Sequence, residues 1–583
     1  MNANDTFMLL RAFCDELVRC GMRHACTSPG SRSAPLVLSL VREPGLRCWS
    51  HVDERCAGFF ALGMAKAGGR PAAVACTSGT AAAHLAPAVH EAHEARVPLL
   101  VLTADRPPEL REVGAGQTID QVKLFGAAAK WYFDVGIHRA TVDRQRWMRA
   151  LACRAYWTAL ADRPGVVHLN FPLREPLVPE GELLEVQPGR DGGAPWVRRP
   201  SRPAGPGAPG HELLRMVSEA RRGVVVAGRM EGDPDAGEAV AQFAAAAGFP
   251  LLADPLSGAR RGPAAIAHYD ATLRDSRAAV ARPDLVIRVG DLPTSKPLRA
   301  WLARLHEAPQ APAGRGEDFA VARARQVVLD PHGAWPDPAG VLEASLPLEP
   351  GPALRALLPE LSSGDPAWLD LWRAADARTA GAIEKALGRE LSEPRVAALL
   401  GEALPAQATL VVASSMPVRD VETFFPTRDD APRVLSNRGA NGIDGTVSTA
   451  FGAAAAGEGP VVVLLGDVAL AHDVGGLLAA GRLGLHLTIV LLNNDGGGIF
   501  HFLPIAGEED AFEEHVATPH GLDFAHAAAL YGCEHRLVED TAGLEEALRA
   551  TLGAPATTIL EVRTERRANE ALHRRVWAAI AAA

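Results

Sequence analysis

The stretch 461–500, VVVLLGDVALAHDVGGLLAAGRLGLHLTIVLLNNDGGGIF, is the part of this 583-residue chain that decides its fold. Two apolar runs, 460–465 and 486–492, are each followed by a polar residue, Asp467 after the first and Asn494 after the second. Continuous apolar runs separated by a helix-length segment indicate neighbouring strands of a parallel sheet. The carboxyl ends of such strands share one edge, where α/β proteins bind their ligands.

Those residue types suit a magnesium ion that carries a diphosphate. Mg²⁺ prefers a few protein oxygens together with phosphate oxygens and water, and Asp467 and Asn494 supply one carboxylate and one amide oxygen. The turn 495–498, Asp-Gly-Gly-Gly, allows close backbone approach, and a helix that opens at Asp467 offers free N–H groups to an anion. Asp, Asn and Gly also occur as ordinary helix-capping and turn residues, so the interpretation as a metal site depends on the 27-position spacing and the glycine triplet.

Composition excludes several other classes of protein. Hydrophobic residues make up 48% and charged residues 22%, so the chain is not disordered over its length, and the net charge of −10 argues against a nucleic-acid partner. The most apolar stretch, 460–480, contains Asp467, His472 and Asp473, so no membrane insertion is expected. No basic region precedes the first apolar run, and the eight cysteines form no CxxC pair. We therefore expect a cytoplasmic protein with reduced cysteines.

The chain alternates short apolar strands with helices, which predicts an α/β fold of three doubly wound parallel-sheet domains. The expected domains are 1–190, 205–355 and 365–583, separated by an extended Pro/Gly-rich linker at 173–211 and a second break at 346–366. Helices are expected at 6–20, 54–67 and 80–94 in the first domain. The outer domains share a layout, since Gly79 to Asp105 and Asp467 to Asn494 span 26 and 27 positions. Any two βαβ units could look this similar.

The pattern GD followed by NN resembles the diphosphate- and metal-binding motif of thiamine diphosphate enzymes. The resemblance implies that Asp467, Asn494 and the Gly496 carbonyl bind Mg²⁺, with Mn²⁺ as an alternative ion, and that Gly466 contacts the cofactor. It also implies that Glu54, in SHVDERCAGFFALGMAKAGG (50–69), places its carboxyl group against the aminopyrimidine ring. Taken alone, Glu54 would be a glutamate favoured at a helix start. Ile443 and Phe500 would pack on the cofactor.

A narrower resemblance extends over both outer thirds of the chain. TSPGSRSAPL (27–36), HVDERCAGFFALG (51–63), TSGTAAAHLAPAV (77–89), LTADRPPEL (102–110), SNRGANGIDGTVSTAFG (436–452) and NNDGGGIFHFLP (493–504) resemble the 2-succinyl-5-enolpyruvyl-6-hydroxy-3-cyclohexene-1-carboxylate synthases of menaquinone biosynthesis. The middle third matches mainly in LPTSKPL (292–298). The resemblance implies a transferase that decarboxylates 2-oxoglutarate and adds the succinyl unit to isochorismate.

Both substrates are dianions, so the resemblance implies a site rich in arginine, whose planar guanidinium binds carboxylates. The residues that match the family's substrate-binding positions are Ser31, Arg32, Arg106, Gln117, Lys296, Ser415, Arg419 and Arg438. Arg419 and Arg438 would hold the 2-oxoglutarate-derived part; Arg32, Arg106, Gln117 and Lys296 would hold isochorismate. The chain departs from some relatives at Gly116, where they have Asn, and at Pro297, where they have Arg.

The resemblance also implies a homodimer or homotetramer with active sites at the subunit interface. Another thiamine diphosphate-dependent 2-oxoacid decarboxylase or synthase is the nearest alternative, followed by a non-catalytic relative that binds the cofactor and, more distantly, a redox dehydrogenase. His472 and His501 flank the cofactor loop; they are interpreted as structural histidines, with a proton shuttle as the alternative. His90 and His93, in HEAHEA, are expected on a solvated helix face.

Overall fold

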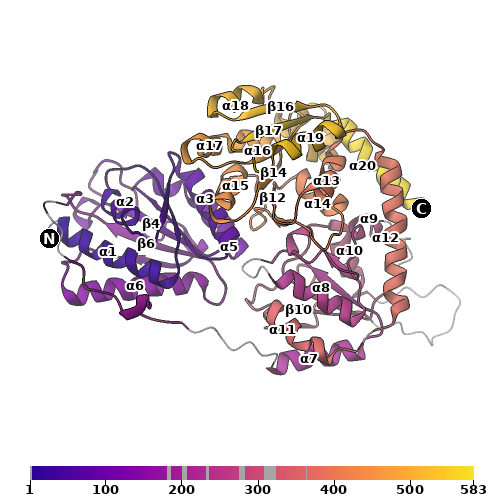
Figure 1. Ribbon diagram of the computed structural model, residues 1–583, viewed down its shortest axis with the longest axis horizontal. Helices are drawn as coiled ribbons and strands as arrows, with labels where there is room; N and C mark the ends of the chain where they lie inside the picture. Colours follow the sequence, from indigo (N-terminus) through magenta and orange to yellow (C-terminus); the bar gives the residue numbers. More distant parts are fainter. Residues whose placement is uncertain are drawn as a thin grey trace.

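The computed structural model describes residues 3–179, 181, 185–199, 207–230, 235–274, 282–307, 323–362 and 364–583. Their strands form three sheets in which every strand pairing is parallel. The sheets follow one another along the chain and appear in Figure 1 in indigo, magenta and orange-yellow. The expected α/β fold with three parallel-sheet domains is confirmed, whereas the domain limits at 190, 205, 355 and 365 stay predictions.

The first sheet contains β1 (His24–Thr27), β2 (Arg47–Ser50), β3 (Ala72–Cys76), β4 (Leu99–Asp105), β5 (Ala129–Asp134) and β6 (Val166–Pro172). The second contains β7 (Gly223–Ala227), β8 (Leu251–Ala253), β9 (Leu285–Val289), β10 (Arg325–Leu329) and β11 (Ala344–Leu346). The third contains β12 (Thr409–Val412), β13 (Arg433–Leu435), β14 (Val461–Gly466), β15 (Thr488–Asn493), β16 (Glu534–Val538) and β17 (Thr558–Arg563).

The helices before the second sheet are α1 (Ala3–Cys20), α2 (Ala34–Val41), α3 (Glu54–Gly68), α4 (Thr80–Ala83), α5 (Ala86–Ala95), α6 (Val142–Leu160) and α7 (Gly207–Glu219). The middle of the chain adds α8 (Ala236–Ala247), α9 (Tyr269–Thr272), α10 (Lys296–Arg304), α11 (Pro350–Leu357) and α12 (Pro366–Leu387). The last third adds α13 (Glu393–Ala403), α14 (Met416–Phe424), α15 (Thr446–Ala456), α16 (Asp467–His472), α17 (Leu478–Leu483), α18 (Phe524–Tyr531), α19 (Thr541–Thr551) and α20 (Arg566–Ala581).

The outer sheets share one strand order. The first runs β2-β1-β3-β4-β6-β5 and the third runs β13-β12-β14-β15-β17-β16, so each strand of one has a counterpart at the same place in the other. The layout similarity that the sequence shows between the outer domains is therefore a true correspondence of topology.

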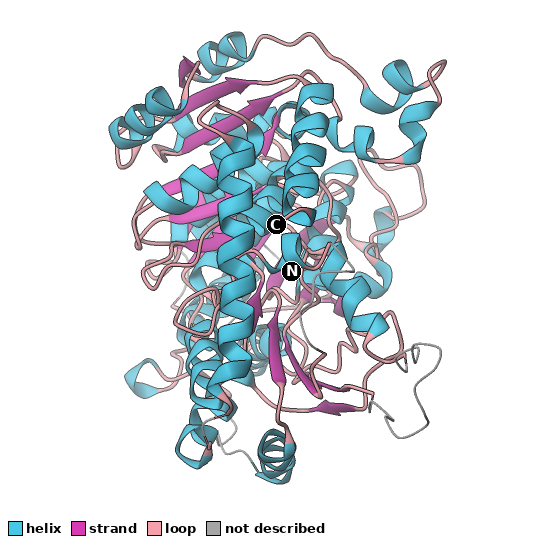
Figure 2. Cartoon of the chain, turned by 90° about the vertical axis from the view of Figure 1, so that its right-hand side faces the viewer, coloured by secondary structure: helices cyan, strands magenta, loops and turns pink. Residues whose placement is uncertain are grey.

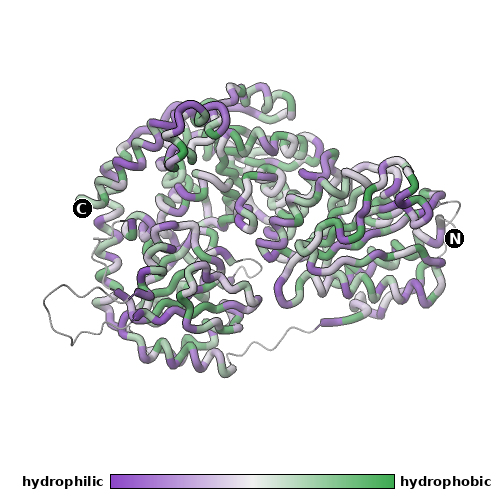
Figure 3. The backbone as a smooth tube through the Cα atoms, turned by 180° about the vertical axis from the view of Figure 1, so that it is seen from behind, coloured by the Kyte–Doolittle hydropathy of each residue, from purple (hydrophilic) through white to green (hydrophobic). Residues whose placement is uncertain are grey.

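Each outer sheet is buried on both faces, as its continuous apolar strands predict. Alternate residues of β4 belong to two different hydrophobic clusters, Leu99 and Val101 to one and Leu100 and Leu102 to the other. Figure 3 shows green, hydrophobic stretches of the chain inside the molecule and stretches that alternate between green and purple nearer its outside. The long helix α12 runs along the side of the molecule and contacts α20 and α9 (Figure 2).

Helices α3 and α15 join the first and third domains through very close backbone contact. A Cβ added at Gly63 would lie 2.0 Å from the Thr449 carbonyl oxygen, and one at Gly452 would lie 2.1 Å from that of Phe60. One hydrophobic cluster, including Phe60 and Phe451, consequently runs from the first sheet into the third. The two domains share a core through this helix pair.

Two local predictions are wrong. The helix expected at 80–94 is two helices, α4 and α5, because Pro87 in the first turn of α5 lacks the N–H that would continue the helix. The stretch expected as an extended linker is partly docked, since Val197 donates its N–H to Cys153 Sγ (3.3 Å) and accepts the Trp157 indole N–H (2.8 Å). Helix α7 also begins inside that stretch. Residues 180, 182–184 and 200–206 of the expected linker lie outside the described part of the chain.

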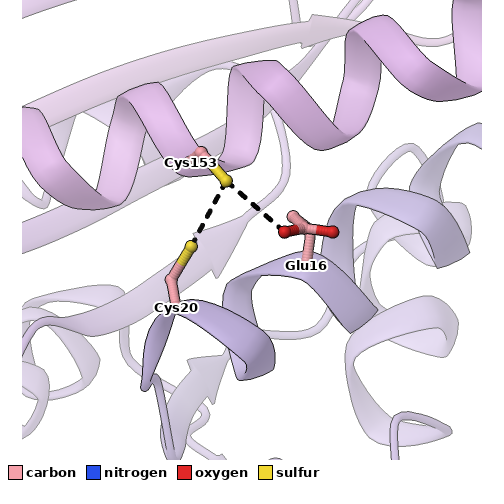
Figure 4. Close-up of side chains that lie close together, drawn as sticks. All are labelled: Glu16, Cys20 and Cys153. Carbon is pink, nitrogen blue, oxygen red and sulfur yellow. Dashed lines mark hydrogen bonds between the residues drawn. The ribbon is translucent and has the colours of Figure 1, made fainter. Parts of the chain in front are cut away.

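All eight cysteines are free, as expected, and six of them are buried. Cys20 and Cys153 lie closest, with their sulfur atoms 3.5 Å apart between α1 and α6, and Cys153 also bonds Glu16 (3.4 Å; Figure 4). Burial protects such thiols from reaction, which favours a structural role. Among the described residues, no helix combines the length and apolar character needed to cross a bilayer.

Candidate functional site

Asp467 and Asn494 meet at the carboxyl edge of the third sheet. Asp467 follows β14 as the first residue of α16, and Asn494 follows the adjacent strand β15. The buried Asp467 carboxylate accepts the backbone N–H groups of Asn494 (3.1 Å) and Gly496 (2.9 Å) through Oδ2 and that of Val468 (2.7 Å) through Oδ1. These bonds fix the loop that follows β15 against the start of α16.

The glycine turn after Asn494 has a conformation that side chains would prevent. Gly496 has φ +134°, and a Cβ there would lie 2.3 Å from the Ala517 carbonyl oxygen. Asp495, at φ +58°, secures the turn by accepting the N–H groups of His520 and Gly521. Because its glycines carry no side chain, the turn leaves its backbone accessible from the cavity that adjoins this edge of the sheet.

A cavity of about 140 Å³ adjoins this edge of the sheet. Its lining brings together seven of the residues that the sequence predicts for the site: Ser415, Ile443, Gly466, Asp467, Asn494, Gly496 and Phe500. Ile443 and Phe500 give it an apolar wall opposite the polar strand ends. The arrangement suits a ligand with one anionic end and one apolar end.

The oxygen atoms in this cavity fit a divalent cation. Asn494 Oδ1 is buried and has no hydrogen-bond partner among the residues that the structure describes, and an orphaned acceptor of this kind is costly unless something binds it. Among the described residues, the Gly496 carbonyl accepts a hydrogen bond from the Gly498 N–H alone (3.0 Å), which leaves it a second lone pair. Together with the Asp467 carboxylate, these atoms form the hard-oxygen set expected for Mg²⁺.

Glu393, which the sequence analysis missed, lies behind Asn494. This buried carboxylate accepts hydrogen bonds from Asn494 Nδ2 (2.9 Å) and the Thr564 hydroxyl (2.8 Å). Burial raises the pKa of Glu393 to about 7, the charge of Asp420 adds to the rise, and the two hydrogen bonds oppose it. Since 101 positions separate Glu393 from Asn494, no local pattern identifies the pair.

Three arginine side chains lie near one another where the middle and third domains meet: Arg299 of the middle domain and Arg419 and Arg438 of the third. Burial and the charges of Arg419 and Arg299 together lower the pKa of Arg438 to about 10, although the charge of Asp254 opposes them. Within the described residues, none of these three arginines has a carboxylate at ion-pair distance. Arg438 bonds Ser414 Oγ (3.3 Å), and Arg419 bonds the Ser415 carbonyl. Arg419 and Arg438 are half-buried and Arg299 is exposed, and a group of cations of this kind attracts an anion with more than one charge.

The predicted substrate residues of the first domain form a separate cluster at the carboxyl edge of its sheet. Arg106 bonds Ser78 Oγ (2.7 Å), and Gln117 donates to the Ser78 carbonyl (3.1 Å), so the buried Ser78 links them. Burial and the neighbouring charge of Arg32 both lower the pKa of Arg106. Arg32 pairs with Glu175 (3.1 Å), next to the exposed Ser31. None of these residues lines the cavity at Asp467.

The two departures from the family pattern have structural explanations. The Gly116 carbonyl accepts a hydrogen bond from Arg106 (2.8 Å), so the backbone contributes where a side chain is missing. Pro297 lies in the first turn of α10, where its missing N–H has no helical partner to lose. Lys296 begins that helix and is exposed.

Glu54 is the first residue of α3, capped by Asp53, and its side chain is 15% exposed. The following residues contact the third domain, since Cys56 Sγ lies 3.7 Å from Asp473 Oδ1 and Phe59 packs on Gly445. Glu54 itself does not line the cavity at Asp467. It therefore stands beside the third domain of its own chain without completing the cavity.

The histidines near the cofactor loop lie away from the cavity lining. His472 is 3.5 Å from Asp444, and the His501 ring packs against Phe512 with centroids 4.8 Å apart. His520, which the sequence analysis missed, is closer, with Nε2 3.3 Å from Asp467 Oδ2. The structural roles of His472 and His501 stay predictions.

Comparison with known families covers most of the chain. Residues 8–124 match the N-terminal TPP binding domain of thiamine pyrophosphate enzymes, residues 192–309 the middle domain of thiamine pyrophosphate enzymes, and residues 418–562 the C-terminal TPP binding domain. Thiamine pyrophosphate is another name for thiamine diphosphate. The three matches follow the order of the three sheets.

Curated relatives align over nearly their whole length. The relatives below all carry the name 2-succinyl-5-enolpyruvyl-6-hydroxy-3-cyclohexene-1-carboxylate synthase. The protein of Geobacillus kaustophilus is 44% identical, with 98% of this chain and 97% of the relative covered. That of Chloroflexus aurantiacus is 44% identical with coverage of 97% and 95%, and that of Myxococcus xanthus is 43% identical with coverage of 100% and 98%.

Proposed function

This chain belongs to the 2-succinyl-5-enolpyruvyl-6-hydroxy-3-cyclohexene-1-carboxylate synthase family of thiamine diphosphate enzymes, and we propose that it joins 2-oxoglutarate to isochorismate in menaquinone biosynthesis. The bond from C1 to C2 of 2-oxoglutarate breaks with loss of carbon dioxide, and a new carbon–carbon bond forms to the isochorismate ring. The full-length similarity to relatives of that name carries the proposal.

The third domain would hold the cofactor. Asp467, Asn494 and the Gly496 carbonyl would bind Mg²⁺, Gly466 would contact the diphosphate, and Ile443 and Phe500 would contact the apolar part. Thiamine diphosphate supplies the electron sink for decarboxylation, and the chain supplies placement and electrostatics. Glu54 would exchange a proton with the aminopyrimidine ring as the catalytic carboxyl group.

The arginine residues would select dianionic substrates. Arg419, Arg438 and Ser415 would hold the carboxylates of 2-oxoglutarate, because the two guanidiniums have no carboxylate at ion-pair distance in the part of the chain that the structure describes. Ser31, Arg32, Arg106, Gln117 and Lys296 would hold isochorismate. A smaller monocarboxylate substrate, as in other 2-oxoacid decarboxylases, would not require so many positively charged side chains.

The reaction is tested with purified protein, thiamine diphosphate, Mg²⁺ and both substrates, following isochorismate loss and product mass. A succinylated adduct should form only with both substrates and be absent in Glu54→Gln, whereas Glu109→Gln, an exposed change in the same domain, should retain it. Carbon dioxide release without adduct would indicate another 2-oxoacid decarboxylase. Cofactor binding without turnover in the wild type would indicate a non-catalytic relative.

The active site would lie between two copies of a homo-oligomer. The cavity lining within one chain contains no residue of the first domain, which supports the supply of Glu54 by a second copy. Glu54→Gln and Asp467→Ala would each be inactive alone. In a randomly mixed dimer they should recover about one quarter of the wild-type activity, because half the dimers then hold one intact site of two. No recovery would place Glu54 and Asp467 of the same chain in one site.

A further inference from the structure

Three separate elements converge behind the carboxamide of Asn494. Glu393 is the first residue of α13, Asn494 follows β15, and Thr564 follows β17. Glu393 is only 1% exposed, yet it belongs to the lining of the cavity that contains Asp467. It is therefore a buried carboxylate immediately next to a residue proposed to bind the metal ion.

The hydrogen bond from Asn494 to Glu393 decides which way the carboxamide faces. An asparagine side chain has a donor end, Nδ2, and an acceptor end, Oδ1, whereas an ionised carboxylate only accepts. Nδ2 donates to Glu393 Oε1 at 2.9 Å, so Oδ1 faces away from Glu393 and is left without a partner. The reversed carboxamide would bring two acceptors together and would offer a cation two N–H groups.

Glu393 is itself held in place. The Thr564 hydroxyl donates to the same Oε1 at 2.8 Å. This one oxygen therefore accepts hydrogen bonds from the residues that follow β15 and β17. The N-cap Ser392, whose side chain accepts the Arg395 N–H, fixes the start of α13 beside it. An oxygen that is buried and accepts two hydrogen bonds has little freedom to move, so it fixes the donor amide in turn.

We propose that Glu393 is a positioning residue for the divalent cation: it holds the Asn494 carboxamide with its oxygen directed into the cavity. This rests on the proposed function, since it assumes that Asp467 and Asn494 bind the ion. Residues that orient metal ligands govern affinity because the ligand otherwise has to be turned and fixed upon binding. Glu393 has no direct contact with the cation in this arrangement.

The test measures Mn²⁺ affinity by electron paramagnetic resonance, in the presence of thiamine diphosphate and without substrates. Glu393→Met fills the same volume but cannot hold the amide, and we expect about 10- to 100-fold weaker Mn²⁺ binding. Glu393→Gln keeps an oxygen acceptor for Nδ2 and should stay close to the wild type. Glu384→Gln is the matched control, because Glu384, on α12, is 69% exposed and pairs with Arg395 of α13, the helix that Glu393 begins.

Two further variants separate orientation from general stability. In an Asn494→Ala background, Glu393→Met should cause no additional loss of Mn²⁺ affinity, because the amide that it orients is gone. A purely structural Glu393 would lower affinity equally in both backgrounds. If Glu393→Met does not fold, Thr564→Val removes the hydroxyl that fixes Oε1 and should weaken Mn²⁺ binding to a smaller extent.

The proposal is overturned if Glu393→Met, or Thr564→Val in its place, binds Mn²⁺ like the wild type, or if Glu393→Gln loses as much affinity as Glu393→Met. Failure of the proposed site itself looks different. In that case the wild type would show no cofactor-dependent Mn²⁺ binding, or Asp467→Ala would leave it unchanged.

Discussion

The Glu91 carboxylate on α5 accepts the backbone N–H of Gly439 at 2.8 Å, which ties the first domain to a loop of the third. Its other oxygen accepts the Ala440 N–H at 2.7 Å. Lys66, buried beside it, donates to the Ser436 carbonyl at 2.8 Å and lies 3.8 Å from Glu91. The loop held in this way carries Arg438, so a buried ion pair of one domain positions a proposed substrate residue of another.

Glu91→Gln should weaken both the fold and substrate binding. The amide NH₂ would face one of the two backbone N–H groups, and Lys66 would lose its buried counter-charge. Breaking a buried ion pair from one side costs about 3–5 kcal/mol. We expect a lower melting temperature together with a raised KM for 2-oxoglutarate and a smaller change in kcat, measured by thermal denaturation and steady-state kinetics.

Glu94→Gln, on the same helix, provides the control. Its side chain is 54% exposed and lies 3.8 Å from Arg163, a surface pair worth about 0–1 kcal/mol. If Glu91→Gln changed stability no more than Glu94→Gln, the loop would not depend on Glu91. Unchanged KM with lowered stability would show that Arg438 keeps its position without this contact.

The sequence predicts well that Asp467 and Asn494 meet at one edge of the third sheet, because strand ends are local features. Asp467 and Asn494 each follow an apolar run, and parallel pairing of β14 with β15 then brings them together. Edge strands such as β2 and β13 escape prediction because they are short and carry polar residues, Arg47 and Arg433 among them. Their position follows from pairing with β1 and β12, which no local pattern encodes.

Residues whose roles depend on another domain are equally hard to predict. The HEAHEA segment alternates like a solvated helix face, and His90 is indeed exposed, but Glu91 is buried because the 436–440 loop covers it. Glu393 and Asn494 lie in the same domain, but 101 positions separate them, which is too far for a local pattern to link them. Arg299 becomes notable only because the middle domain brings it beside Arg419 and Arg438.

Gly63→Ala should separate the first and third domains. The new methyl carbon would lie 2.0 Å from the Thr449 carbonyl oxygen, a contact that α3 and α15 can relieve only by moving apart. We expect a clear fall in melting temperature and loss of activity. Gly381→Ala, in the exposed part of α12 with nothing within 4 Å, should be neutral or stabilise by up to about 1 kcal/mol. Equal effects of the two changes would contradict the close packing at Gly63.

Arg299→Ala should impair binding of a dianionic substrate. Arg299 lines the same cavity as Arg438, and its charge lowers the pKa of both Arg419 and Arg438. A hydrogen bond to a charged group is worth about 1.5–3 kcal/mol, so kcat/KM should fall about 10- to 100-fold, mainly through KM. The loss should diminish at high salt, since screening weakens the interaction in the wild type as well. Arg304→Ala, exposed on the same helix, should leave kcat/KM unchanged.

His168 should make the first domain sensitive to acid. It lies fully buried on β6, with Nε2 2.8 Å from Thr103 Oγ1, and burial lowers its pKa to about 3. In the unfolded chain histidine titrates near pH 6.5. As the pH falls, the unfolded state therefore takes up a proton at His168 before the folded state does. The stability that neutral His168 contributes is thus complete above about pH 6.5 and is lost as the pH falls toward 3, by up to about 1.4 kcal/mol per pH unit.

His168→Gln, which keeps a polar group toward Thr103 but does not titrate, should flatten the fall in melting temperature between pH 7 and pH 5. It should be less stable than the wild type at pH 7, because the ring fills a closed site between Phe125 and Tyr132. The advantage of the wild type should therefore shrink as the pH falls. His526→Gln, at a position where the side chain is 89% exposed, should follow the wild-type profile. Parallel profiles for His168→Gln and the wild type would show that His168 takes up no additional proton on unfolding.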